Sequence, residues 1–544
     1  MPQEPDAPPE ASVGSLPPAA TPAAARPAGA ISRADPAAWL IALAVLAAYT
    51  TLSVFRYLRL QPGSWDLGIY TEYVRQIAHL HAPVVPIRSA GFNLLGDHFQ
   101  PIVALIAPFF RVFPTPVTLL VAQALLAAVS VVAVCQAAQV LTGTGVSRAI
   151  GVAYGFSWGL QQMINFDFHE IAFAVPLLAF SLSALVRGRP RAATWWALPL
   201  VFVKEDQGFT VAAIGLIMLG TAVTGGRLRH RAGPAASGRE WALAGGLLAV
   251  WGLAWSALAI GVIIPHFSAA HHYQYWQDGG VIGPGGSPFS LAGLLRQAAH
   301  GGTEKLGTLA MACLPVAFLA LGSPRALAAL PSLLLRFLST NSYFWGTDWH
   351  YNATLMPVVF LAAVDVLARV RARAARQATA AAQGGAVQDV AAQGDAARAA
   401  AGPVRWRLAA GVPRYSAVVM LVITGWLAAR QPLAGLWHPQ TYVITPHVRA
   451  EQAAIARVPP ATTVEATLSM LAPLAARDST SWVGTVGLRD PRYLVFDATN
   501  SGWSPLPAWP PLRFEDERHP GAAYRQIFEA SGVYVFRRTS PTSR

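Results

Sequence analysis

Five short motifs carry most of the side chains that could do chemistry, and each lies at the end of an apolar run. They are Trp65-Asp66-Leu67-Gly68, Gly96-Asp97-His98-Phe99-Gln100-Pro101, Asp167-Phe168-His169-Glu170, Lys204-Glu205-Asp206-Gln207-Gly208 and Asp348-Trp349-His350-Tyr351. Carboxylates and imidazoles can accept protons or bind divalent cations, and lysine can hold a phosphate. Charged groups beside membrane-spanning segments are costly and commonly functional. The motifs are therefore candidate parts of one site.

Asp66 follows the first long apolar run and precedes a stretch that reads as an amphipathic helix at the membrane surface. A partly desolvated carboxylate there could act as a base on a hydroxyl group. Asp is also a preferred helix cap, so capping is the simpler interpretation. The two roles do not exclude each other.

The next two motifs place carboxylates beside imidazoles. Asp97 and His98 could bind a divalent cation or a phosphate, or be a cap and a surface histidine. Asp167, His169 and Glu170 sit between two apolar runs, where Asp167 and Glu170 are further candidate catalytic groups. No spacing here matches a known metal signature. A divalent cation stays possible, with Asp97, His98, Asp167 and His169 as candidate ligands.

The last two motifs suggest contacts to an anionic sugar donor. Lys204 could hold a lipid phosphate while Glu205 and Asp206 orient a sugar, or the three could form an internal ion pair. Asp348 and His350 lie among aromatic residues, which stack on sugars but also belong at any membrane interface. The sequence does not separate these readings.

The composition indicates a membrane protein. Of the 544 residues, 54% are hydrophobic and only 12% are charged, which is outside the range of ordinary soluble domains. The net charge of +13 comes mainly from arginines in short loops, so it reports topology and does not suggest nucleic-acid binding. Phosphate-cradling glycine loops, nucleotide fingerprints and zinc motifs are absent from the sequence.

Apolar runs predict a mostly α-helical, polytopic transmembrane bundle of about eleven helices. The expected spans are 38–57, 117–141, 148–164, 170–186, 192–204, 207–224, 241–264, 306–322, 326–338, 353–369 and 413–430. Arginine clusters at 187–191, 227–239 and 369–376 are expected on the cytoplasmic side, which puts the N-terminus inside and all five motifs outside. The segment 99–113 is short and contains prolines, so we expect it to lie in the outer interface.

The chain divides further by composition. Residues 1–35 are rich in proline and alanine and predict a disordered cytoplasmic tail. The transmembrane domain covers 36–370, a low-complexity cytoplasmic linker is expected over 371–412, and the last span follows at 413–430. Residues 431–544 predict a small extracytoplasmic α/β domain with helices at 443–457 and 522–530, and strands at 463–467, 493–496 and 533–536.

Together the five motifs resemble a bacterial family of predicted membrane proteins that is classed only as a domain of unknown function. That family is similar to the GT-C glycosyltransferases, which include the protein O-mannosyltransferases and the lipid A aminoarabinose transferase. The resemblance implies a multi-pass enzyme of the cell membrane that moves a sugar from a polyprenyl-phosphate donor to an extracytoplasmic acceptor. It assigns Asp66 as the catalytic base, with Asp167 or Glu170 as the second acidic residue.

One departure weakens the assignment of the base, because Asp66 stands alone where several GT-C families have an adjacent Asp-Glu pair. Two other functions stay open. The chain could transport or flip a lipid-linked sugar, although its ionisable groups are expected on one face only, whereas alternating access needs a site reachable from both. It could also be a non-catalytic protein of envelope assembly that acts through its C-terminal domain.

Overall fold

The computed structural model describes residues 35–62, 64–224, 236–277, 291–388, 396–485, 490–499 and 518–539, and all statements below concern these residues. The α-helices are α1 Pro36–Leu58, α2 Asp66–Ala78, α3 Ala107–Val112, α4 Pro116–Thr142, α5 Thr144–Gly155, α6 Trp158–Asn165, α7 Ala174–Val186, α8 Pro190–Ala197, α9 Gln207–Val223, α10 Gly238–Leu258, α11 Ile264–Phe267, α12 Gln274–Gln277, α13 Leu291–Ala299, α14 Gly302–Cys313, α15 Leu330–Leu338, α16 Leu355–Gln388, α17 Ala396–Ala428, α18 Pro446–Arg457 and α19 Leu468–Ala475. The predicted tail over 1–35 lies almost wholly outside the described residues.

The bundle is built on helices long enough to cross a membrane. By length and composition, the described chain has 5 such segments: Pro36–Leu58, Pro116–Thr142, Gly238–Phe267, His350–Ala380 and Gly411–Ala428. Apolar runs of this length are what a bilayer core requires. The prediction of a mostly helical, multi-pass membrane protein is therefore confirmed.

Several other predicted spans are built from shorter pieces. The range 148–164 contains α5 and α6, and 192–204 contains α8 followed by the 3-10 helix η4, Leu198–Phe202. Pro199, Pro315 and Pro331 begin or interrupt such pieces, because proline removes a backbone donor and clashes with the preceding turn. The predicted segment 99–113 consists of η2, Pro101–Ile106, and α3. How these pieces sit in a bilayer stays a prediction.

Helices α9 and α10 approach each other closely at glycines. A Cβ atom added to Gly208 would lie 2.2 Å from the carbonyl oxygen of Gly252, and one added to Gly215 would lie 2.5 Å from that of Gly245. Small residues permit such backbone contact between apolar helices. Ser256 of α10 also donates to the Glu205 carbonyl at 2.6 Å, so the start of α9 is fixed against α10.

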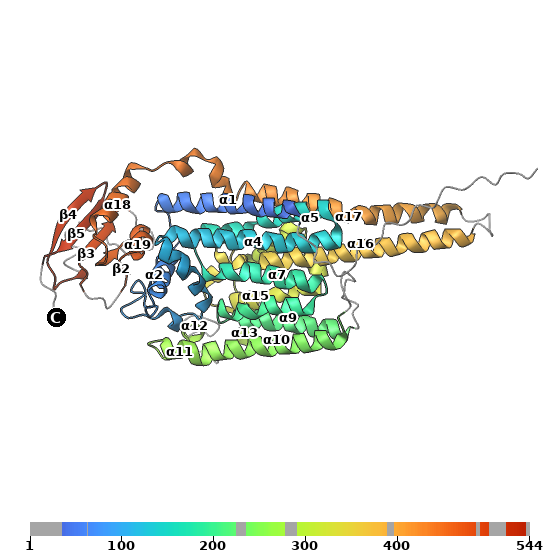
Figure 1. Cartoon of the computed structure of the whole chain (residues 1–544), viewed down its shortest axis with the longest axis horizontal. Helices are drawn as coiled ribbons and strands as arrows, with labels where there is room; N and C mark the ends of the chain where they lie inside the picture. Colours follow the sequence, from blue (N-terminus) through green and yellow to red (C-terminus); the bar gives the residue numbers. More distant parts are fainter. Residues whose placement is uncertain are drawn as a thin grey trace, which may run out of the picture.

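The predicted cytoplasmic linker over 371–412 is largely helical. Helix α16 continues to Gln388 and α17 begins at Ala396, and Figure 1 shows the two helices extending side by side beyond the bundle. Alanine, glutamine and arginine are strong helix formers, so low complexity did not mean an irregular chain here.

The C-terminal domain is a mixed five-stranded sheet with helices α18 and α19. Its strands are β1 Thr463–Ala466, β2 Ser479–Trp482, β3 Tyr493–Asp497, β4 Tyr524–Ala530 and β5 Val533–Arg538. Their order is β2-β1-β3-β5-β4, with β1 parallel to β2 and β3, and β5 antiparallel to β3 and β4. The predicted helix over 522–530 is wrong. That segment is β4, because pairing with β5 overrides its helical composition.

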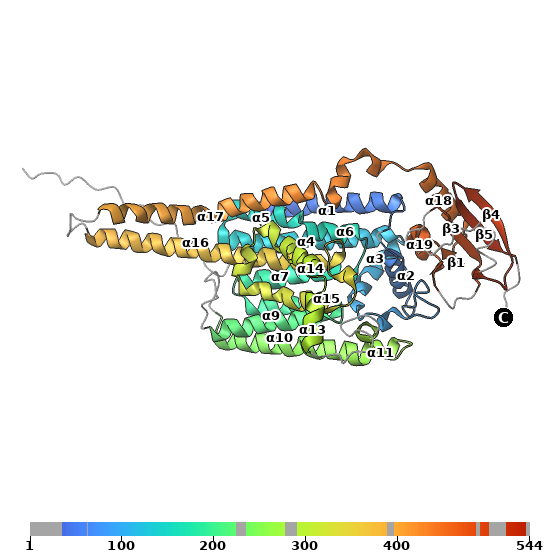
Figure 2. The ribbon, with the colours of Figure 1, turned by 180° about the vertical axis from the view of Figure 1, so that it is seen from behind.

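The C-terminal domain packs directly on α2. Arg75 of α2 donates to the carbonyl groups of Ala475 at 2.9 Å and Asp478 at 3.1 Å. A Cβ atom on Gly68 would lie 3.2 Å from Leu471 of α19. Figure 2 shows α2 at the end of the bundle that faces α19 and the sheet, opposite the free ends of α16 and α17.

Candidate functional site

A cavity of about 480 Å³ lies where α2 meets the ends of several bundle helices. Its walls include nine of the eleven side chains that the sequence singled out: Asp66, Asp97, His98, His169, Glu170, Lys204, Glu205, Asp206 and His350. They come from segments up to about 280 residues apart, and they meet because each lies at or beside a helix end on the same side of the bundle. The cavity is the candidate site.

Asp66 is the first residue of α2 and lines the cavity. The helix cap is Trp65, which makes no side-chain capping bond, and Ser64 Oγ accepts the Asp66 N–H at 2.9 Å. The capping interpretation of Asp66 is therefore not what the structure shows. Burial raises the pKa of the Asp66 carboxyl, although nearby His169 opposes the shift. Within the described chain Asp66 makes no ion pair, unlike Glu170 and Glu205.

Glu170 is the centre of what we call the Glu170 cluster, formed with Tyr70, His169 and Lys204. The carboxylate is fully buried, accepts from the Tyr70 hydroxyl, and lies 2.5 Å from His169 Nδ1 and 3.4 Å from Lys204 Nζ. A buried carboxylate is stable only when it is paired and hydrogen-bonded. Here its own neighbours supply both the charge and the donors.

Glu205 holds a second part of the wall in place. It lies 2.8 Å from His98 Nδ1 and accepts from the Phe99 N–H at 3.1 Å and from the Tyr273 hydroxyl at 2.8 Å. Burial and Lys204 lower the pKa of His98, but the carboxylates of Glu205 and Asp97 outweigh them and leave the pKa raised. His98 therefore carries positive charge more readily than a free histidine.

His350 is a buried polar side chain whose hydrogen-bonding capacity is not used by the described protein. It is 2% exposed and stacks on His169 with ring centroids 3.6 Å apart. Neither of its ring nitrogens has a hydrogen-bond partner in the described chain. Buried polar atoms are rarely left unsatisfied, so a cavity wall carrying one is suited to a polar ligand.

Two predicted residues are not part of the cavity wall. Asp348 is exposed, and Asp167 is buried behind the wall with a φ of 77°, where its carbonyl accepts from Gln123. Asp167 was expected to share the site with Glu170. The turn at Asp167 directs the chain so that His169 and Glu170 line the cavity while Asp167 does not.

Three of the predicted metal ligands are paired with other side chains. Asp97 lies 3.5 Å from Arg88 and accepts from Tyr275, His98 is paired with Glu205, and His169 with Glu170. A metal ligand needs a free lone pair directed at a common point. These groups are instead used in separate pairs, and Asp167 lies outside the cavity wall. The four residues are not gathered into a metal-type group in the described chain, and metal binding by them stays a prediction.

Two arginines that line the cavity, Arg88 and Arg336, are not predicted from the sequence. Arg336 is 6% exposed and donates to the carbonyls of Phe344 at 2.8 Å and Gly346 at 3.0 Å, and to Asn352 Oδ1 at 3.0 Å. It lies within the apolar sequence of α15. A charged residue inside such a run is itself a functional signal, so Arg336 could have been found.

The sequence from residue 56 to residue 388 matches the family described as predicted membrane protein, DUF2079. The chain belongs to this family. All of the residues that line the cavity fall within the DUF2079 region, whereas the C-terminal domain lies beyond it. A comparison with curated proteins finds no significant match.

Solved structures of other proteins are similar to the chain at low sequence identity. ArnT from Cupriavidus metallidurans bound to undecaprenyl phosphate is 15% identical, with a TM-score of 0.47, and the match covers 91% of this chain and 97% of ArnT. The archaeal oligosaccharyltransferase AglB from Archaeoglobus fulgidus, in complex with an inhibitory peptide and a dolichol-phosphate, is 12% identical with a TM-score of 0.35. That match covers 84% of this chain and 69% of AglB.

Proposed function

We propose that this DUF2079 protein is a membrane glycosyltransferase that moves a sugar from a polyprenyl-phosphate donor to an extracytoplasmic acceptor. The observation that carries the proposal is the pairing state of the carboxylates in the cavity. Glu170 and Glu205 are held in ion pairs, while Asp66 and Asp206 are not, and burial raises the pKa of both. We take Asp66 as the base because it lies in the first loop after α1, at the start of α2. A general base must be free to take a proton, and its strength increases with its pKa.

The cationic side chains that line the cavity are suited to a donor that carries a phosphate. Lys204, Arg88 and Arg336 line the same cavity as Asp66, and a phosphate is best held by such groups where water is excluded. Trp349 and Tyr343 also line it, and aromatic rings give a sugar an apolar face to pack on. The combination suits an anionic lipid carrier bearing a sugar.

The proposed reaction inverts the configuration at the anomeric carbon of the donor sugar. Asp66 takes the proton of an acceptor hydroxyl, and the acceptor oxygen attacks the anomeric carbon from the face opposite the phosphate. The bond from that carbon to the phosphate oxygen breaks, and polyprenyl phosphate leaves with the electron pair, stabilised by Lys204. We expect the acceptor to be a glycan, a lipid or a protein of the cell envelope.

We also propose that the cavity and the C-terminal domain are extracytoplasmic and the N-terminus is cytoplasmic. The cavity-side helices α2 and α12 and the sheet lie at one end of the bundle, and the arginine-bearing helices α16 and α17 extend from the other (Figure 1). Short basic segments favour the cytoplasmic side.

The test uses purified full-length protein in lipid nanodiscs with a panel of polyprenyl-phosphate sugars, scored by release of polyprenyl phosphate. We expect the wild-type protein to release the carrier from at least one donor and Asp66→Asn to lower the rate at least about 100-fold. Glu240→Gln is the control, because Glu240 lies on α10 outside the cavity wall, and it should leave most activity. No release from any donor by folded wild-type protein, or full activity in Asp66→Asn, would overturn the proposal.

A further inference from the structure

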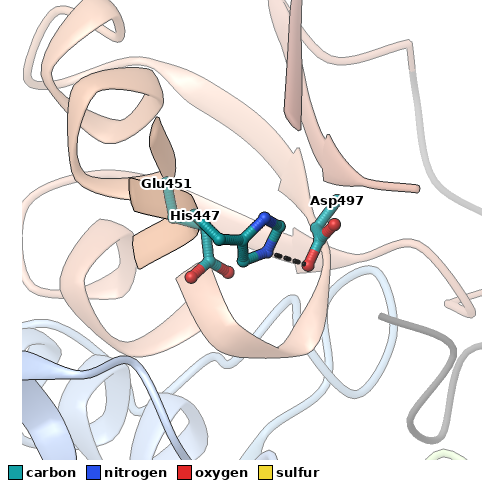
Figure 3. Close-up of side chains that lie close together, drawn as sticks. All are labelled: His447, Glu451 and Asp497. Carbon is teal, nitrogen blue, oxygen red and sulfur yellow. Dashed lines mark hydrogen bonds and ion pairs between the residues drawn. The ribbon is translucent and has the colours of Figure 1, made fainter. Parts of the chain in front are cut away.

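A second group of chemically active side chains lies in the C-terminal domain, away from the cavity. His447 and Glu451 are four residues apart on α18, so they share one face of the helix. Asp497 ends β3. One ligand atom from each of the three lies within 4.8 Å of the others, and no other group of this kind is found among the described residues. We call these three residues the C-terminal cluster (Figure 3).

The hydrogen bonds of His447 fix which ring nitrogen carries a hydrogen. Nδ1 lies 3.0 Å from the carbonyl oxygen of Ser531, which can only accept, so Nδ1 is the donor. Nε2 lies 2.9 Å from Asp497 Oδ2. Nε2 is thus the ring nitrogen that can bind a metal ion beside Asp497 Oδ2.

Each carboxylate has one oxygen held in place by the surrounding protein. Asp497 Oδ1 accepts from the N–H of Thr499 at 2.8 Å and from its hydroxyl at 2.7 Å. Glu451 Oε1 accepts from the Ser469 hydroxyl at 2.5 Å. Such outer contacts orient metal ligands and leave their second atoms free for the ion. All three side chains thus have the arrangement expected of first ligands with their supporting bonds.

The charge of the cluster suits a divalent cation. Asp497 is fully buried and Glu451 is 3% exposed, yet no lysine or arginine forms an ion pair with either in the described chain. Buried carboxylates without an arginine or lysine partner are costly. A divalent ion would balance the charge of both.

We propose that His447, Glu451 and Asp497 bind a divalent transition-metal ion of the zinc class. One imidazole nitrogen and two carboxylate oxygens are ligands that Zn²⁺ accepts, and three protein ligands leave a fourth position for water. The side chain of His447 is 33% exposed, which gives the ion a path from solvent. The site lies outside the DUF2079 region and is independent of the proposed transferase activity.

The test measures metal binding by the full-length protein in nanodiscs after treatment with a chelator. Titration calorimetry with Zn²⁺ should show one site per chain. We expect His447→Gln, Glu451→Gln and Asp497→Asn each to weaken binding at least tenfold. His438→Gln is the control, because His438 is exposed and lies outside the cluster, and it should bind as the wild type does. No binding by the wild type, or unchanged affinity in the three variants, would overturn the proposal.

A spectroscopic measurement on the wild type keeps the test decisive if a variant does not fold. Co²⁺ in a site of nitrogen and oxygen ligands should give visible absorption bands without thiolate charge transfer. Cys135 and Cys313 are the only cysteines. Charge-transfer bands from sulfur would place the ion in the bundle and contradict the proposal.

Discussion

The Glu170 cluster and the C-terminal cluster use the same residue types and reach opposite outcomes. Glu170 is contacted by a hydroxyl, an imidazole and a lysine, so its negative charge is met by the protein itself. In the C-terminal cluster two buried carboxylates lie near one imidazole, which is paired with Asp497. The difference teaches that counting cations and donors around each carboxylate separates groups that hold a structure together from groups that leave room for a ligand.

The largest effect is expected from a substitution that disrupts the Glu170 cluster, in which the protein balances the charge. Glu170→Gln removes the carboxylate that pairs with Lys204 and His169, and removing one partner of a buried ion pair costs about 3–5 kcal/mol. Denaturant unfolding in nanodiscs measures the loss. Asp66→Asn is the matched control, because Asp66 makes no described ion pair, and it should cost under about 1 kcal/mol. Equal losses in the two variants would contradict the distinction between the two carboxylates.

A third carboxylate, Glu72 on α2, lies between these extremes and predicts a dependence on pH. Burial raises its pKa from 4.5 to about 8, although Arg75 opposes the shift. The folded state therefore keeps a proton that the unfolded state releases above pH 4.5. Stability is highest below that pH and falls as the pH rises toward 8, by on the order of 1 kcal/mol per pH unit.

Melting temperatures across this pH range check the prediction for Glu72. The variant Glu72→Gln cannot titrate, so its stability should change less between pH 4.5 and pH 8 than that of the wild type. Arg75 keeps its bonds to the carbonyls of Ala475 and Asp478 in the variant, which limits other effects. Parallel pH profiles for both proteins would show that Glu72 is ionised throughout.

The smallest effect is expected for the stability of the C-terminal cluster in the absence of metal. Asp497 is fully buried, but His447 is 33% exposed to solvent, which screens its pairing with Asp497. His447→Gln should therefore change the metal-free stability by less than about 1 kcal/mol. At a Zn²⁺ concentration of 100 times the dissociation constant, the wild type should gain about 2.7 kcal/mol and the variant little. A large loss without metal would identify the cluster as structural.

The sequence predicts most of the cavity because charge and hydropathy determine where helices end. Asp66, His98, Glu170, Lys204 and His350 all follow or precede apolar runs, and the bundle brings such ends together. The position of Asp167 depends on one left-handed backbone turn, which hydropathy does not encode. Arg88 lies in an irregular loop where nothing in the pattern marks it.

The C-terminal domain shows a different limit to what can be predicted from the sequence. The segment from Ala522 to Ala530 has helical composition, yet Ser531 and Gly532 have φ values of 50° and 78°, as in a tight hairpin turn. That Ser-Gly pair was a visible signal for two strands. The C-terminal cluster was harder to predict, because His447 and Glu451 share a helix face while Asp497 joins them only through the sheet.

Helix α2 gives the molecule a thermodynamic property that neither region has alone. Asp66 and Tyr70 of this helix line the cavity, while Gly68 and Arg75 contact the C-terminal domain. A ligand that favours one position of α2 therefore changes the free energy with which the C-terminal domain packs on this helix. By thermodynamic reciprocity, a change that stabilises the packing of the domain on α2 changes the affinity of the cavity for that ligand by the same factor. Truncating the chain before the C-terminal domain is thus also an alteration of the cavity.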